Sequence, residues 1–483
     1  MNREPIARRT ILAATAAALT GTFLPDGLQA EARPAAGAGP QTIPLRTLGR
    51  RSAATSESIL LPKHTTEPFS LLGVTWADPA LAITATVQVR TRAQATGRWS
   101  AWHTLTSHGS APGDTRGATD PLWAGGSDGV QARLIGGGDV PDDLRLDLID
   151  PGRPPAVIEA RQATLPAMAR GTVPVPARPV PHMITRAGWG ANESMVKGVP
   201  EYTGPTRVFF VHHTATGNGY DCADSAAIVR SIQAYQVHSK GWDDIGYNFL
   251  VDRCGHIFEG RAGGVGHPVL GAHTLGFNTD ASAIAVIGTY DAARPTPNVE
   301  RAIATVAAYK LGAYGNDPAG RVVLTSGGGN LYPRGTEAGL YRISGHRDAG
   351  RTDCPGDALY TRLPAIRAIA GAGPTGLRFL HMTGALKSGS RLYTKGAIKP
   401  LWNVATPSAL IDRFEIWIDG RLVLAEPGSH RTALLRLRRG RHTVAIRAVH
   451  LSGRTSTVST GIISDATASV FTARSRRTRR PAH

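Results

Sequence analysis

A proline-rich stretch is the feature that most constrains how this chain can fold. Residues 151 to 181 contain eight prolines, with alanine, arginine and valine between them, and show no apolar period. Proline fixes φ and lacks a backbone N–H, so a segment this rich in it is typical of an extended linker. At 483 residues the chain has room for about three domains of roughly 150 residues each. We therefore expect separate folding units on the two sides of residues 151–181.

The residues before this linker carry the pattern of β-strands. Short apolar runs alternate with turn residues between 41 and 150, and apolar residues occupy every odd position from 83 to 89. A period of two is typical of a strand with one buried face. Together with Trp99 and Trp102, these runs predict an antiparallel β-sandwich over residues 33–150. No group of potential catalytic residues stands out there.

The residues after the linker predict an α/β domain over 182–372. Apolar runs predict strands at 207–215, 246–252, 257–259 and 283–288, the last apolar enough to be central in a sheet. Helices are expected after the capping pair Asp224 and Ser225, over 300–311, and over 358–369, where Pro364 interrupts the pattern. The expected fold is a mixed central sheet flanked by helices.

Strand signals return after Pro374. Residues 414–418 alternate between apolar and polar, and Asp419-Gly420 before Arg421 is a sequence typical of a hairpin turn. We predict an immunoglobulin-like β domain over residues 375–472. The final residues, 473–483, contain five arginines and nothing that could form a core, and they predict a disordered basic tail.

The first 32 residues have the order of an export signal. Three arginines precede a fourteen-residue run rich in alanine and leucine from Ile11 to Leu24, and small residues follow it. The run is shorter than the roughly 20 residues that span a bilayer. The pair Arg8-Arg9 favours a twin-arginine signal, with an ordinary export signal as the alternative. No later stretch is apolar enough to cross a membrane, so the mature protein is expected to be secreted or attached to the cell envelope.

Most of the net charge of +18 lies towards the C-terminus. Residues 374–483 contain 16 arginines and 3 lysines against 3 aspartates and 2 glutamates, an excess of +14. Such a region attracts any polyanion, including nucleic acid. Because an exported protein meets anionic wall polymers and lipid headgroups first, we predict attachment to anionic cell-wall polymers and expect no nucleic-acid partner.

A histidine and a cysteine close together in the sequence suggest a metal site. His346 and Cys354 lie eight residues apart, and Pro355 predicts that a helix begins directly after the cysteine. Zinc prefers such ligands. A third ligand is expected from the apolar run 207–215, which ends in His212 and His213. Successive strand residues face opposite sides, so one of this pair should reach the metal, and the spacing leaves open which.

The remaining cysteines, Cys222 and Cys254, are expected to form a disulfide. Three cysteines are an odd number, so at least one has another role, and an exported protein meets an oxidising environment. Cys222 precedes a predicted helix and Cys254 lies in a predicted hairpin beyond it. Two free buried thiols are the alternative.

Several motifs, taken together, resemble those of the peptidoglycan recognition proteins, which are related to the phage-lysozyme type of N-acetylmuramoyl-L-alanine amidase. They occur in the family's order over roughly residues 183 to 372, within a chain that looks like an actinobacterial multidomain form. The motifs are Val211-His212-His213-Thr214-Ala215, residues 242–251, Phe258-Glu259-Gly260-Arg261, Gly271-Ala272-His273, residues 284–290, Ser344-Gly345-His346-Arg347-Asp348, and Cys354-Pro355.

The resemblance implies a zinc site formed by His212, His346 and Cys354. Three protein ligands leave a fourth position for water, which is the catalytic rather than the structural arrangement. The family's activity would be hydrolysis of the bond between the lactyl group of N-acetylmuramic acid and L-alanine in peptidoglycan. A non-catalytic peptidoglycan-binding module is the alternative, and the presence of Cys354 favours the enzyme.

The same resemblance assigns further site residues. Tyr247 matches a tyrosine beside the metal, and Thr352 matches the threonine of catalytically active animal members, where phage members carry lysine. Without the resemblance, Tyr247 would be a packing residue and Thr352 a turn residue. The expected groove residues, each of which could equally be structural, are His213, Trp242, Arg261, His273 and Asn278. Residues 262–270 depart from the animal pattern, which leaves the preferred stem peptide open.

Overall fold

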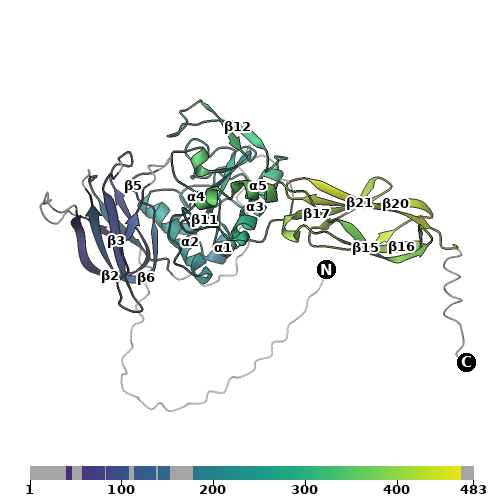
Figure 1. Ribbon diagram of the computed structural model, residues 1–483, viewed down its shortest axis with the longest axis horizontal. Helices are drawn as coiled ribbons and strands as arrows, with labels where there is room; N and C mark the ends of the chain where they lie inside the picture. The colour runs from purple at the N-terminus through teal and green to yellow at the C-terminus, as the bar shows by residue number, and fades with distance from the viewer. Residues whose placement is uncertain are drawn as a thin grey trace, which may run out of the picture. The chain divides into compact units, whose positions relative to one another are not determined.

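A computed structural model describes residues 40–45, 57–81, 83–107, 114–136, 140–152 and 178–468 of the chain. Figure 1 shows these residues as a coloured ribbon with the elements labelled. The predicted export signal, most of the predicted linker and the predicted basic tail lie outside the described residues. None of the described helices is long and apolar enough to cross a membrane.

The N-terminal domain (residues 40–152) is built from antiparallel strands, as predicted. Its strands are β1 (Gln41–Pro44), β2 (Glu57–Trp76), β3 (Thr86–Ala93), β4 (His103–Leu105), β5 (Gly117–Ala118), β6 (Leu122–Ile135) and β7 (Arg145–Ile149). They form one sheet in the order β1-β7-β2-β6-β3-β4, with β5 paired to β2. One buried cluster contains residues of β3 and of β7, which β2 and β6 separate in the sheet. The same cluster contains residues of β2 and β6, so these four strands share one core.

The central domain (residues 178–373) is the predicted α/β fold. Its strands are β8 (Val208–His213), β9 (Phe249–Val251), β10 (Ile257–Glu259), β11 (Ala281–Val286), β12 (Arg321–Thr325), β13 (Glu337–Tyr341) and β14 (Ile343–Gly345). Five of them form a sheet in the order β10-β9-β11-β8-β14, and β12 pairs with β13. Only β10 runs antiparallel to its neighbour in that five-stranded sheet. The apolar run at 283–288 overlaps β11, which ends at Val286 and is central in the sheet as predicted.

The helical elements of this domain cover both faces of the sheet. They are α1 (Arg186–Trp189), η1 (Glu193–Met195), η2 (Cys222–Asp224), α2 (Ser225–Ala234), the π-helix η3 (Tyr235–Ser239), α3 (Pro297–Gly312), η4 (His346–Asp348), α4 (Asp357–Tyr360) and α5 (Leu363–Ala370). Phe209 and Val211 of β8 pack in the cluster that contains the apolar residues of α3 and α5. Leu250 of β9 and Ala285 of β11 pack with α2 in another cluster. Burial on both faces explains the continuous apolar runs of β8 and β11.

The predicted helix start after Cys354 is wrong. The helix α4 begins at Asp357, and Gly356 with a φ of 85° precedes it as the N-cap residue. Cys354 and Pro355 therefore belong to the loop between η4 and α4. Pro364 does interrupt the predicted helix over 358–369, because it lies in the first turn of α5, where its missing N–H costs nothing.

Residues 374–468 form the C-terminal β region. Its elements are β15 (Arg378–Ser388), β16 (Arg391–Asn403), η5 (Ser408–Leu410), β17 (Ile411–Ile418), β18 (Arg421–Pro427), β19 (Leu435–Arg436), β20 (Gly440–His450) and β21 (Thr455–Ser464). The strands form one sheet in the order β15-β16-β21-β20-β17-β18, with β19 on β16. Asp419 and Gly420 join β17 to β18 with φ values of 50° and 77°, as a hairpin turn of the predicted kind requires. The immunoglobulin-like architecture stays a prediction.

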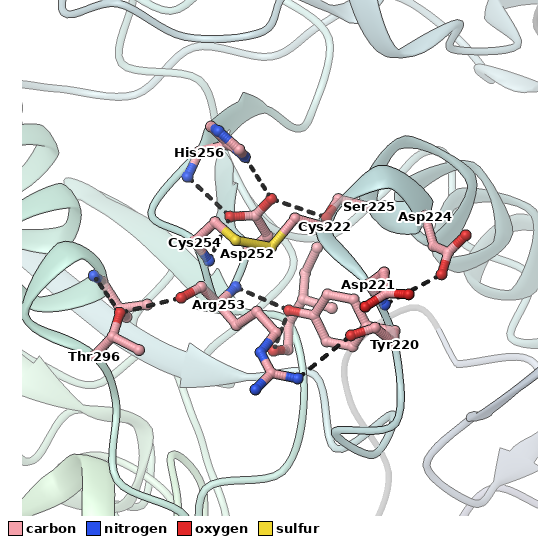
Figure 2. The surroundings of a disulfide bond; sticks show 12 residues. Tyr220, Asp221, Cys222, Asp224, Ser225, Asp252, Arg253, Cys254, His256 and Thr296 are labelled. Carbon is pink, nitrogen blue, oxygen red and sulfur yellow. Dashed lines mark hydrogen bonds and ion pairs between the residues drawn. A yellow bond between two sulfur atoms is a disulfide. The ribbon is translucent and has the colours of Figure 1, made fainter.

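A disulfide joins Cys222 to Cys254 across 32 residues of sequence. Figure 2 shows that the bond links the start of the helical segment at η2 and α2 to the turn between β9 and β10. Beside it, the buried Asp252 carboxylate accepts hydrogen bonds from the Ser225 hydroxyl at 2.9 Å and from the backbone N–H of Cys254 at 3.0 Å. The predicted pairing is present in the structure.

Candidate metal centre

Two neighbouring parallel strands bring His212 and His346 together. The strands β8 and β14 pair with Gly345 opposite Val211. The residues that follow these two, His212 within β8 and His346 at the start of η4, are therefore neighbours. Their ring centroids lie 4.6 Å apart. On β8 the side chains alternate, and His213 lies on the face of Phe209 and Val211, away from this contact. Strand register therefore selects His212 as the partner of His346.

Cys354 approaches the two imidazoles from the loop before α4. One ligand atom from each of His212, His346 and Cys354 lies within 4.8 Å of the other two. The Cys354 Sγ is 3.7 Å from His212 Nδ1. Two such ligands on one tetrahedral zinc, with bonds of about 2.3 and 2.05 Å, would be about 3.6 Å apart. One sulfur and two imidazole nitrogens without a carboxylate are also a donor set that suits zinc better than magnesium or calcium. The three residues thus fit a zinc ion.

Neighbouring polar groups hold these side chains in place. The Thr274 hydroxyl lies 3.3 Å from His212 Nε2, so the opposite ring nitrogen, Nδ1, faces Cys354. The backbone N–H of His213 donates to Cys354 Sγ at 3.4 Å. Such contacts orient metal ligands and fix the histidine tautomer.

Burial keeps His212 and Cys354 uncharged. It lowers the pKa of His212 well below the usual value, and the nearby His346 adds to the effect. Burial also raises the pKa of the Cys354 thiol, and the Asp120 carboxylate adds to that increase. Neutral imidazole is the form of histidine that binds metal, whereas the cysteine must lose its proton as a cation binds.

Most of the predicted site residues line one pocket with the three ligands. Tyr247 lies with its ring centroid 5.3 Å from that of His212, and burial raises the pKa of its phenol, so it remains a hydrogen-bond donor at neutral pH. Thr352 also accepts the backbone N–H of Cys354 at 3.2 Å, as a turn residue would. The predicted residues in this pocket are His213, Trp242, Tyr247, His273 and Thr352.

Arg261 and Asn278 line an adjoining hollow instead, which shares Ala272 with the metal pocket. The Arg261 guanidinium donates to the carbonyl of Ile245 at 3.3 Å, and burial lowers its pKa. The Asn278 amide oxygen accepts the backbone N–H groups of His273 and Thr274. Asn278 thus orients the segment that carries His273.

The pocket also contains residues that the sequence did not suggest. Lys240, Asn330 and Arg351 belong to the central domain, and Asp120 belongs to the N-terminal domain. No motif marks any of them, because they reach the pocket only through the tertiary fold. Thr274, which contacts His212, directly follows the predicted His273 in the sequence.

Comparisons with known proteins identify relatives of this chain. A family model described as N-acetylmuramoyl-L-alanine amidase matches residues 202–357, and one described as Rv3811 N-terminal galactose-binding domain-like matches residues 28–160. Peptidoglycan-recognition protein SC2 of Drosophila melanogaster is 31% identical over 185 residues, which cover 38% of this chain and 84% of that protein. The chain belongs to the peptidoglycan recognition protein family.

Other proteins match the same part of the chain. N-acetylmuramoyl-L-alanine amidases of Homo sapiens and Sus scrofa are 37% and 34% identical over 38% of this chain, and the matches span 28% and 27% of those two proteins. The solved structure of wild-type Drosophila PGRP-LB is 26% identical over 38% of this chain and 92% of that chain, with a TM-score of 0.30.

Proposed function

We propose that this peptidoglycan recognition protein is an exported zinc amidase that hydrolyses the N-acetylmuramoyl-L-alanine bond of peptidoglycan. The observation that carries the proposal is the convergence of His212, His346 and Cys354, within 4.8 Å of one another, at the wall of a pocket. The family model matched over residues 202–357 supports the same reaction.

Zinc bound by these three residues would polarise the scissile carbonyl and supply hydroxide near neutral pH. The chain's own residues then hold the substrate and stabilise the developing charge. Tyr247 carries a protonated phenol into the pocket, where it can donate a hydrogen bond to the oxyanion that forms at the carbonyl. Hydrolysis leaves a lactyl carboxylate on the sugar and a free amine on L-alanine, which takes up the proton of the attacking water.

Thr352 and the adjoining hollow complete the proposed site. The Thr352 hydroxyl lines the pocket and can hydrogen-bond the tetrahedral intermediate. Beyond Ala272, Arg261 lines the adjoining hollow. Its guanidinium would bind a carboxylate of the stem peptide, since arginine pairs with carboxylates in a bidentate way. His213, Trp242 and His273 would contact the substrate nearer the metal.

The test measures release of free stem peptide from purified peptidoglycan by mass spectrometry, together with zinc content. We expect about one zinc per chain and cleavage that stops with a chelator or with Cys354→Ser. An exposed histidine on β15 offers a matched control, and His381→Ala should keep both zinc and activity. Zinc-independent binding of peptidoglycan fragments without cleavage would instead identify a non-catalytic binding module.

We also propose that the protein is retained at anionic wall polymers through residues 374–483, whose formal charge is +14 from 19 basic and 5 acidic residues. Screening by salt weakens attraction between exposed charges. Retention on isolated walls should therefore fall as salt is raised from 50 to 500 mM. Unchanged retention would refute this attachment and leave the amidase proposal standing.

A further inference from the structure

A segment of the N-terminal domain is bound to the edge of the metal pocket. This segment, residues 114–120, contacts the end of η3 and the loop after it. The Trp242 indole N–H donates to the Asp114 carboxylate at 2.7 Å, and the Lys240 ammonium lies 3.3 Å from the same carboxylate. The backbone N–H of Thr115 donates to the Lys240 carbonyl at 2.9 Å. The segment is thus attached at its first two residues.

The other end of the segment is attached to the same helix. The buried Tyr235 hydroxyl donates to the Thr119 carbonyl at 3.0 Å. Glycine at position 73 makes this approach possible, because a Cβ there would lie 2.3 Å from the Tyr235 hydroxyl. Leu71 of β2 and Ile149 of β7 belong to the buried cluster that contains the apolar residues of α2. Apolar packing between the two domains and these hydrogen bonds together hold the segment against the central domain.

Asp120 is the charged residue that this segment adds to the pocket. Ala118, Thr119 and Asp120 line the same hollow as the three potential zinc ligands. The Asp120 carboxylate is held in place, since Thr106 donates its hydroxyl to it at 2.9 Å and accepts the backbone N–H of Asp120 at 2.7 Å. A carboxylate fixed in this way acts on any charged group of a substrate bound beside the metal.

We propose that the 114–120 segment is a wall of the substrate site and that Asp120 is a specificity-determining residue that disfavours a substrate carboxylate near the scissile amide. The inference rests on the proposed amidase function. In peptidoglycan stems, the D-glutamate that follows L-alanine is linked through its γ-carboxyl, and its α-carboxyl is either free or amidated. The free and the amidated α-carboxyl differ by one negative charge, and this group lies one residue from the cleaved bond. Asp120 would therefore discriminate between the two forms of the stem.

The test compares two muropeptides that are identical except for this α-carboxylate or α-amide. Lys240 and Arg351 also line the pocket, so the absolute preference of the wild type does not decide the matter. The deciding quantity is the ratio of kcat/KM for the acid to that for the amide. Repulsion between two like charges in a partly hydrated site corresponds to roughly five-fold in rate. Asp120→Asn should raise the ratio by about that factor.

Two further variants make the result interpretable. Asp120→Ser removes the charge and keeps an oxygen for Thr106, so it should give the same change even if the asparagine variant folds poorly. The exposed Asp142 of the N-terminal domain provides the matched control, and Asp142→Asn should leave the ratio unchanged. An unchanged ratio in both Asp120 variants, with cleavage intact, would overturn the inference while the proposed function stands.

Failure of the proposed function would give a different result. If the wild-type protein with zinc cleaves neither muropeptide, the amidase proposal fails, and the same comparison is made with dissociation constants. If both Asp120 variants bind the α-carboxylate muropeptide about five-fold more tightly relative to the α-amide than the wild type does, segment 114–120 is still supported as a wall of the substrate site. Equal affinity ratios, or no binding of either muropeptide, would overturn it.

Discussion

Replacing Cys222 and Cys254 together with serine should lower the free energy of unfolding of the central domain by about 4 kcal/mol. The disulfide closes a loop across 32 residues of sequence. In the chain-entropy model, closing a loop of that length removes about 12 cal/mol/K from the unfolded chain, which is roughly 3.7 kcal/mol at 25 °C. The estimate assumes that the folded structure is the same with and without the bond.

The surroundings of the disulfide support that assumption (Figure 2). The Tyr220 hydroxyl accepts the backbone N–H of Arg253 at 2.9 Å, and Ser225 donates to Asp252 at 2.9 Å. These bonds join the same two segments as the disulfide does. The folded geometry should therefore persist in the double variant, and the loss of stability should come from the freer unfolded chain.

Hydrogen exchange provides the assay, because a chain with several domains need not unfold in one step. The slowest amides of β8 and β11, which are fully buried, report the unfolding of the central sheet. They should exchange faster in the double variant by the equivalent of about 4 kcal/mol, whereas amides of β17 and β20 should not change. A difference below about 1 kcal/mol in β8 and β11 would refute the loop-entropy argument.

Three further predictions concern single side chains. Burial lowers the pKa of His450 from 6.5 to about 4, so the folded state binds fewer protons than the unfolded state between these values. The contribution of His450 to the free energy of unfolding should be fully present above pH 6.5 and should fall by about 3 kcal/mol as the pH drops to 4. Urea unfolding of the C-terminal β region measures this free energy in the wild type and in His450→Asn at each pH. An equal dependence on pH in the two proteins would contradict the prediction. Tyr247→Phe should lower kcat about 100-fold with little change in KM, as loss of an oxyanion donor does, and an unchanged kcat would remove Tyr247 from the mechanism. Lys310 donates to the carbonyls of Val265, Gly266 and His267, and Lys310→Met should speed hydrogen exchange in residues 262–270 by the equivalent of about 2 kcal/mol; unaltered exchange would show that the bonds contribute little.

Local patterns predicted the main strands and helices of the central domain because burial and capping determine the residue types in these segments. The strands β8 and β11 are buried on both faces, and their continuous apolar sequences reflect that burial. The helix α3 begins after a capping threonine with proline in its first turn and extends over the predicted 300–311. The turn at Asp419-Gly420 also depends only on local backbone preference.

Which residues meet at the site depends on tertiary contacts, and the spacing of residues in the sequence does not reveal these contacts. Alternation along β8 separates His212 from His213, but the pairing of β14 with β8 decides which of them meets His346. The rule that places proline in a first helical turn failed at Pro355, since Gly356 provides the turn into α4. Asp120 had no signal at all, because it comes from a strand-rich region more than ninety residues before the first ligand and reaches the pocket through domain contact.

The buried cluster that contains Leu71, Ile149 and the apolar residues of α2 affects how cooperatively the chain unfolds. Apolar surface on both sides of this contact would become exposed to water if either partner unfolded first, so the N-terminal and central domains should melt as one cooperative unit. A protease that cuts the connecting chain between residues 152 and 178 should then leave two fragments that elute together in size-exclusion chromatography.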